Sequence, residues 1–339
     1  MGFKLLEPED LVISTDSVTA TVWSNNTPTL TSFQTSSIQV ATNTGQYYYS
    51  VYQTESTDAT AAVQFDIAYC DSVGSGSSFF NALVTGSSPS RTNFGQYRNL
   101  VLADENASFI FGNETGSYFY ALNVERARYK QQLLEGTMTL SLSGSGGILS
   151  LTDDSSIQSA TTFNDAGRVF NLVSGSAGTV YTGVNTQGWS ANSGSYGMFL
   201  PDVGLLLLNG KALDGATAAG GIALGTGRAF DTNNTNPSKM CAALKLGNGW
   251  TLNSREQLSS DFIFVRARNN EFNYSENPSF ISGSTGAVIF DSFVDNPTTY
   301  ITSVGMYNVN NELLAVAKLS RPLPKDFTKE LLVRVKLDF

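Results

Sequence analysis

The chain has 339 residues and a net charge of −9, so a general electrostatic attraction to nucleic acid or to an anionic membrane surface is not expected. It contains no histidine, which removes the commonest general base and the commonest metal ligand. Charged residues make up only 14%, against about 25% in ordinary globular domains. The polar positions are dominated by Ser, Thr, Asn and Gly, which favour strands and turns over helix interiors.

Alternating apolar and polar residues dominate the first third of the chain, and this period-two pattern predicts half-buried strands. A turn rich in Gly and Ser, with Gly74 and Gly76, follows the fourth of them. The strands expected here span residues 17–23, 37–40, 47–52, 62–69, 100–102, 108–111 and 118–124.

One helix is expected at residues 125–134, because this stretch consists of good helix formers and Gly136 stands where a left-handed C-terminal residue is favoured. A strand at 137–142 and a Gly-rich turn at 144–147 follow it. The next region, to residue 260, is rich in Gly and Asn. It is expected to hold two buried strands within 197–209, a loop at 231–240 and a short helix at 241–246.

The C-terminal region has a clearer pattern. Strands are expected at 262–265, 287–290 and 300–307, and a hairpin turn at 308–311 leads into another strand at 312–319. In the last strand, Val333, Val335, Leu337 and Phe339 share one face, whereas Arg334, Lys336 and Asp338 share the other.

These elements predict a mainly β fold of short antiparallel strands in sandwich-like or meander-like sheets, with one or two short helices. Three regions are expected: an N-terminal β-rich domain at 1–146 with the helix near 125–134, the middle region at 147–260, and a C-terminal meander at 261–339. The middle and C-terminal regions can share one sheet system. No apolar run is long enough to span a bilayer, and the first residues lack a secretory signal, so synthesis in the cytoplasm is expected.

No motif with a specific chemistry is present: zinc-ligand spacing, GxGxxG, the P-loop, GxSxG and the EF-hand loop are all missing from the sequence. Cys70 and Cys241 are expected to be buried free thiols. The adjacent acids, Asp153-Asp154, Asp104-Glu105 and Glu271/Glu276, are expected in solvated turns rather than as a catalytic pair. The basic residues Arg126, Arg128 and Lys130 are expected on a solvated or partner-facing surface. Neither a catalytic site nor a cofactor is predicted.

The stretch RARNNEFNYSENPSF at 266–280 has two interpretations, a ligand site or a corner whose amides hold the backbone. Asn side chains mimic backbone groups in turns, and Asn277-Pro278 favours an extended entry, so the corner is favoured. Arg266 and Arg268 share a strand face and can pair with Glu271 or Glu276. Because loops of this kind also form contacts between subunits, the candidate interface residues are Arg266, Arg268, Asn270, Glu271, Tyr274 and Asn277.

Four stretches resemble virion structural proteins of T-even-like tailed myoviruses of cyanobacterial and marine hosts. They are FQTSSIQVATNTGQYYYSVY (33–52), SYFYALNVERARYKQQLLEGTMTLSLSG (117–144), RARNNEFNYSENPSF (266–280) and NPTTYITSVGMYNVNNELLAVAKLSRPLPKDFTKELLVRVKLDF (296–339). The resemblance spans most of the chain and implies a structural role in the virion, in the tail or baseplate. It carries over no catalytic residue.

The expected function is therefore a non-enzymatic component of a contractile phage tail, at the baseplate or its periphery, which is assembled in the host cytoplasm. Its expected partners are other virion structural proteins in symmetric multiple copies, with neither nucleic acid nor membrane. The alternatives are a neck, collar, head-decoration or other tail-accessory protein, and a fibre-attachment or glycan-binding module that would group Trp and Tyr on one sheet face. A carboxylate glycosidase is a third possibility, which exposed turns at Asp153 and Asp154 would argue against.

Overall fold

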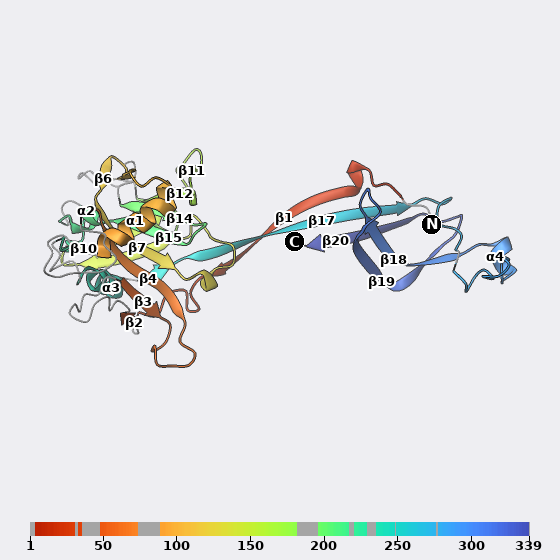
Figure 1. Ribbon diagram of the computed structural model, residues 1–339, viewed down its shortest axis with the longest axis horizontal. Helices are drawn as coiled ribbons and strands as arrows, with labels where there is room; N and C mark the ends of the chain where they lie inside the picture. The colour runs from red at the N-terminus through yellow and green to blue at the C-terminus, as the bar shows by residue number, and fades with distance from the viewer. Residues whose placement is uncertain are drawn as a thin grey trace. The chain divides into compact units, whose positions relative to one another are not determined.

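The computed structural model describes residues 4–30, 33–35, 48–73, 89–181, 196–216, 220–228, 235–247, 249–275 and 277–338. It divides the chain into two compact units (Figure 1). Unit 1 comprises Met1–Ser17 and Gln257–Phe339, and unit 2 comprises Val18–Glu256. The mainly β expectation is confirmed, and the described residues contain four α-helices rather than one or two.

Unit 2 is built on a 12-stranded sheet that curls into a half-barrel, with the principal strand order β16-β9-β10-β12-β14-β15-β7-β4-β3-β2. All strand pairs along this order are antiparallel. Its strands are β2 (Phe33–Thr35), β3 (Tyr48–Tyr52), β4 (Val63–Asp71), β7 (Tyr118–Val124), β9 (Thr139–Gly144), β10 (Gly147–Asp153), β11 (Thr162–Asn164), β12 (Gly167–Ser176), β13 (Thr179–Val180), β14 (Gly197–Leu200), β15 (Leu205–Asn209) and β16 (Trp250–Thr251). The helices α1 (Pro89–Leu102), α2 (Gly210–Asp214) and α3 (Asn236–Leu246), the hairpin β5 (Phe109–Phe111) with β6 (Glu114–Gly116), and the short strand β8 (Gln132–Leu133) complete it.

The central strands of this sheet are buried on both faces. Side chains of a strand alternate between faces, and in β15 Leu206 and Leu208 enter one core whereas Leu205 and Leu207 enter another. The first core also holds Trp23, Trp250 and residues of α2 and α3, and the second holds residues of α1 and of the β5–β6 hairpin. Burial on both sides explains why β15 has an uninterrupted apolar sequence.

Unit 1 contains two layers. Its sheet has the order β1-β17-β20, where β1 (Leu11–Thr21) and β17 (Asn253–Ala267) run through the division between the units and β20 is Leu331–Asp338. The second layer is the hairpin of β18 (Thr299–Tyr307) and β19 (Leu313–Lys325). Ile263, Val333 and Val335 pack against apolar residues of this hairpin and form a small core. A 3-10 turn (Pro8–Asp10) and helix α4 (Ser292–Asp295) complete the unit.

Many of the expected strands are confirmed. Those at 47–52, 62–69, 108–111, 118–124, 137–142, within 197–209, at 300–307 and at 312–319 all overlap observed strands, and the terminal strand has the predicted buried and exposed faces. The strand at 17–23 overlaps β1, but β1 is exposed along nearly all of its length. The strand expected at 37–40, the turn at Gly74 and Gly76, and the first part of the 231–240 loop lie outside the described residues.

The helix expected at 125–134 is wrong. The chain forms one 3-10 turn at Arg126–Arg128 and then β8. The backbone N–H of Leu133 donates to the carbonyl of Pro201 at 3.0 Å, and that of Leu134 donates to the carbonyl of Asn253 at 2.8 Å. These bonds to distant segments replace the bonds of a helix, so tertiary structure overrides a favourable helix propensity.

Three other expectations also need correction. Residues 100–102 end helix α1 instead of forming a strand, because Phe94, Tyr97 and Val101 recur at helical spacing and pack on the second core. Residues 287–290 form no strand and contribute only an isolated bridge between Val288 and Ile281. Helix α3 begins five residues before the expected start, with a proline in its first turn.

The boundary expected at residue 146 falls inside one sheet, because β9 and β10 pair as a hairpin across residues 144–147. The division near residue 257 lies close to the start of the expected C-terminal region, but unit 1 also takes in the first 17 residues. Among the described helices, none combines the length and apolar character that crossing a bilayer requires.

Candidate functional site

The corner after β17 is organised around a buried lysine. Lys325 ends β19 and has no exposed surface, and its Nζ donates to the carbonyls of Asn269 at 3.0 Å and Asp326 at 2.8 Å, and to Oδ1 of Asn273 at 2.7 Å. An ammonium group has three protons, so every one of them is used. All three acceptors are neutral oxygens, and burial lowers the pKa of Lys325 below its ordinary value.

The asparagine amides of the corner hold its backbone, as the corner interpretation predicts. Nδ2 of Asn273 donates to the carbonyl of Asn269 at 2.6 Å, and the hydroxyl of Thr299 donates to the carbonyl of Phe272 at 2.6 Å. Phe272 has a φ of 55°, a left-handed conformation that is costly for an aromatic residue. Asn277 begins the next turn, where its carbonyl accepts from the N–H of Phe280 at 2.8 Å. This geometry is that of a fixed corner.

The six candidate interface residues lie along this corner, and five of them are exposed. Arg266 is the penultimate residue of β17, and Arg268, Asn270, Tyr274 and Asn277 follow it on the surface.

The sixth, Glu271, is half-buried and binds Nζ of Lys4 at 2.9 Å. The backbone N–H of Arg268 and the ammonium of Lys4 lower the pKa of Glu271. The expected side-chain pairing of Glu271 with an arginine is therefore replaced by a pairing with Lys4, and Glu276 lies outside the described residues. Sequence reasoning missed Lys325 as the centre of the corner, because no local pattern marks it.

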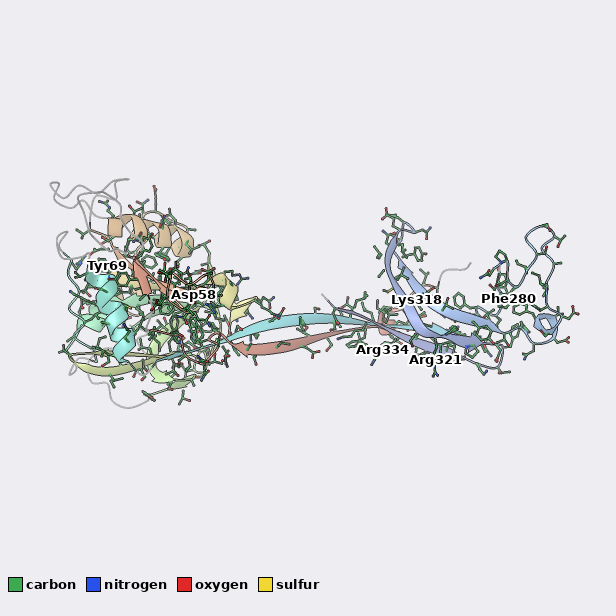
Figure 2. The ribbon with its side chains drawn as sticks, turned by 90° about the horizontal axis from the view of Figure 1, so that it is seen from below. Asp58, Tyr69, Phe280, Lys318, Arg321 and Arg334 are labelled. Atoms are coloured by element: carbon green, nitrogen blue, oxygen red, sulfur yellow. The ribbon has the colours of Figure 1, made fainter. Side chains whose placement is uncertain are left out.

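A cationic face, defined by Phe262, Phe264, Arg266, Arg334 and Lys336, lies on β17 and β20 next to this corner. Arg334, which Figure 2 labels, is paired with Phe264, and Lys336 is paired with Phe262 across the two strands. All these side chains therefore share one side of the sheet. The guanidinium of Arg334 lies 5.5 Å and the ammonium of Lys336 lies 5.8 Å from the centre of the Phe262 ring. This side faces away from the small core of unit 1, since the alternate residues Ile263, Val333 and Val335 form that core.

Asp153 and Asp154 are not in a solvated turn; both are buried. Asp153 accepts from the backbone N–H of Gly136 at 2.9 Å, and Asp154 accepts from the backbone N–H of Asn171 at 2.9 Å and from its amide at 2.8 Å. Burial raises the pKa of Asp153. The two carboxylates therefore act as acceptors that fix turns of unit 2. Asp104, by contrast, lies in an exposed turn, where it accepts from a backbone N–H.

A second polar cluster joins β4, β7 and the segment before α3. Buried Asp71 accepts from the hydroxyl of Tyr69 at 2.7 Å and from Nη2 of Arg228 at 2.8 Å, and the Arg228 guanidinium lies 4.6 Å from the centre of the Tyr118 ring. The hydroxyl of Tyr118 donates to Asp214 at 2.9 Å. Burial raises the pKa of both tyrosines. The polar groups of this cluster are hydrogen-bonded to one another, so the cluster fixes Arg228 against β4 and β7 rather than presenting an open site.

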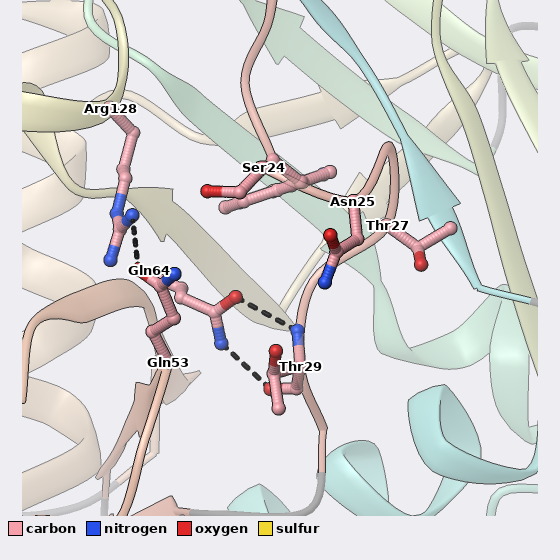
Figure 3. A pocket seen from close by; sticks show the side chains of 8 residues that line it. Ser24, Asn25, Thr27, Thr29, Gln53, Gln64 and Arg128 are labelled. Atoms are coloured by element: carbon pink, nitrogen blue, oxygen red, sulfur yellow. Dashed lines mark hydrogen bonds between the residues drawn. The ribbon is translucent and has the colours of Figure 1, made fainter.

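A cavity of about 10 Å³ lies beside Trp23 (Figure 3). The amide of Gln64 bridges its wall by bonding the backbone of Thr29 in both directions, at 2.9 Å and 2.7 Å, and Arg128 donates to Gln53 at 2.8 Å. This volume suffices for about one water molecule, so the cavity is too small for an organic ligand.

Of the three basic residues expected on a surface, Arg126 and Lys130 are exposed and Arg128 is half-buried, and all three also form contacts within unit 2. Arg128 also binds the carbonyl of Val63 at 3.0 Å, Arg126 stacks on a tyrosine, and Lys130 forms an ion pair of 2.7 Å with Glu256. Arg128 thus holds the segment that was expected to be helical.

Cys70 and Cys241 are buried free thiols, as predicted. Burial raises the pKa of both, which disfavours the reactive thiolate. Within the part of the chain that the structure describes, no three His, Cys, Asp or Glu side chains are grouped so that they could hold a metal ion. No protein-family model, curated protein or solved structure matches the chain.

Proposed function

We propose that this protein is a non-enzymatic structural component of a contractile-tailed phage virion, at the baseplate or its periphery, and that it acts through subunit interfaces. It is assembled in the host cytoplasm with other virion structural proteins. The resemblance of four stretches to virion proteins of T-even-like myoviruses supports this proposal. A mainly β fold that carries few charges is consistent with it.

One observation carries the proposal: unit 1 leaves most of its apolar side chains in water. Among its described residues, the buried apolar side chains are Ile263, Ala267, Val333 and Val335. The exposed ones are many more, and exposed apolar side chains that lie close together mark sites of contact with other proteins. They include Leu11, Val12, Ile13, Val288, Ile289, Phe290, Val294, Tyr300, Tyr307, Leu313, Leu314, Val316 and Leu332.

Strand β1 gives the clearest example. Ten of its eleven residues are exposed, so both of its faces meet solvent. A strand of this kind gains little stability from burial within its own chain. Neighbouring subunits that cover β1 would supply the missing burial.

The alternative functions find less support. A glycan-binding module would present Trp and Tyr on an open sheet face. Trp23 and Trp250 instead lie in the first core, with ring centres 5.2 Å apart. Tyr300 and Tyr307 of β18 are exposed, and Trp189 lies outside the described residues. A carboxylate glycosidase would require accessible acids, and the buried Asp153 and Asp154 are engaged by backbone and amide donors.

Virions purified from an infected host provide the test. Peptide mass spectrometry is expected to detect the chain in them, and electron cryomicroscopy of the tail is expected to place it at the baseplate. Density for the chain at the neck or collar would instead identify it as a neck or collar protein. Its absence from purified virions would overturn the proposal.

A further inference from the structure

We propose that residues 277–298 of one copy, the 277–298 loop, dock on the cationic face of a second copy of this chain. The contact would be heterologous, because the loop and the face are different surfaces. The inference goes beyond the proposed function and does not depend on it, since the contact can be measured on the isolated protein.

The 277–298 loop gains little stability from apolar burial within its own chain. None of its residues is buried, yet Val288, Ile289, Phe290 and Val294 have between 41% and 68% of their surface exposed. Local backbone bonds and one ring contact, 5.3 Å between the centres of Phe280 and Phe293, hold its shape. A loop that is ordered around exposed apolar side chains is suited to a contact that covers them.

The charge of the loop restricts what can cover it. The sequence has no Lys or Arg between Arg268 and Lys318. The loop carries Asp291 just before helix α4 and Asp295 at its end, and both are exposed. Neither carboxylate forms an ion pair with a described residue. The fitting partner surface is therefore apolar and cationic.

The cationic face has these properties. Phe262 and Phe264 are half-buried, and Leu332 beside them is 59% exposed. Arg266 and Arg334 are exposed, and neither forms an ion pair within the described part of the chain. Asp338, an acid on the same side, is engaged by Lys336 at 2.9 Å and by the hydroxyl of Ser260 at 2.7 Å. Two arginines thus remain to meet the two aspartates of the loop.

The loop does not cover the face of its own chain. Figure 2 shows Phe280, at the start of the loop, well away from Arg334 within unit 1. A second copy is needed to bring the two surfaces together. Because each copy has one loop and one face, successive copies can close into a ring.

Sedimentation velocity of the full chain over a range of concentrations tests the contact. The wild type is expected to self-associate, and more weakly as salt is raised. The double variants Asp291→Lys with Asp295→Lys and Arg266→Glu with Arg334→Glu are each expected to associate at least about ten-fold more weakly, because like charges then face each other. Asp104→Lys with Glu105→Lys, which reverses two charges in an exposed turn of unit 2, is the matched control and should behave as the wild type.

Mixing the two double variants gives the decisive result. Lysines on the loop of one then face glutamates on the other, and the unchanged loop of the second faces the unchanged arginines of the first, so association is expected to return. Circular dichroism and the melting temperature check that each variant is folded. A wild type that remains monomeric, double variants that associate like the wild type, or a mixture that stays dissociated would each overturn the proposal.

Discussion

Replacement of Lys325 by Met tests the buried lysine that organises the corner after β17. The variant keeps a chain of similar length but removes the ammonium, and with it the three bonds that Nζ donates. Unit 1 is expected to lose stability, because its small core contributes little and the corner connects both of its layers.

The size of the loss follows from what the three acceptors retain. The carbonyl of Asn269 keeps the amide of Asn273, and the carbonyl of Asp326 keeps the N–H of Lys329 at 3.3 Å. Oδ1 of Asn273 is left without a described partner, and a buried orphaned acceptor costs about 1–3 kcal/mol. The weakened carbonyl bonds add to this cost and the removed desolvation of the ammonium offsets part of it, so a net loss of about 2–4 kcal/mol is expected.

The assay must report on unit 1 alone. All three tryptophans lie between residues 18 and 256, so their fluorescence follows unit 2. Hydrogen exchange measured by mass spectrometry in rising urea follows peptides of β17 and β20 directly. Lys325→Met is expected to lower the urea midpoint of these peptides by about 1 M or more.

Lys329→Met is the matched control. Lys329 is exposed and pairs with Asp326 at 3.0 Å, so its loss should cost less than about 1 kcal/mol. The pH dependence of stability gives a second readout. Burial lowers the pKa of Lys325 in the folded chain below its ordinary value of 10.5. Between these two pKa values the unfolded chain therefore holds a proton on Lys325 more readily than the folded chain does. The wild type should therefore gain stability relative to Lys325→Met as pH rises through that window. Equal urea midpoints for Lys325→Met and Lys329→Met would refute the reasoning.

Three further predictions concern individual contacts. Asp154→Ala leaves two N–H donors of Asn171 on β12 without their acceptor, and is expected to destabilise unit 2 by about 2–3 kcal/mol in urea unfolding followed by tryptophan fluorescence; an unchanged midpoint would contradict this. The pKa of Glu271 is lowered in the folded chain, so the ionised Glu271 stabilises unit 1 at any pH above the ordinary pKa of 4.5. This stabilisation is lost as the pH falls through the lowered pKa of the folded chain. Glu271→Gln should remove that part of the acid sensitivity of unit 1, and an identical pH profile would count against it. Deletion of Leu337–Phe339 should lower the melting temperature of unit 1, since Leu337 packs beside its small core; a wild-type melting temperature would exclude this.

The strand pattern could be read from the sequence where a strand buries one face or both. Strand β7 has the predicted bounds, and β3 and β4 are within two residues of theirs, because alternation along the chain directly reflects the alternation of side chains in a pleated strand. The hairpin turn at 308–311 was recognisable for a similar reason, since Asn308 accepts from the N–H of Asn310 two residues on. Such features depend on neighbours in the sequence.

The wrong predictions arise where residues bond to segments that are distant in the sequence. Residues 125–134 have helix-forming side chains, but their backbone bonds segments that are far away in the sequence. Asp153 and Asp154 have the local pattern of a solvated turn, and the curled sheet buries them. In each case the deciding partner comes from another part of the chain.

The same distinction between local and distant contacts applies to the candidate site. The asparagine-rich composition of 266–280 was enough to predict a corner that holds its own backbone, since these amides act on groups a few residues away. The role of Lys325 was not accessible in this way, because Asn273 lies 52 residues from it. The register of β18 against β19 pairs Lys325 with Thr299, whose hydroxyl binds the carbonyl of Phe272 in the corner. The cationic face likewise needs the register of β17 against β20, which places residues that are 70 positions apart on one side of a sheet. Hydrophobic periodicity and turn-forming residues are local properties of the chain. The burial of a residue, its hydrogen-bond and ion-pair partners, and the arrangement of charges on the surface follow from contacts that exist only once the chain has folded.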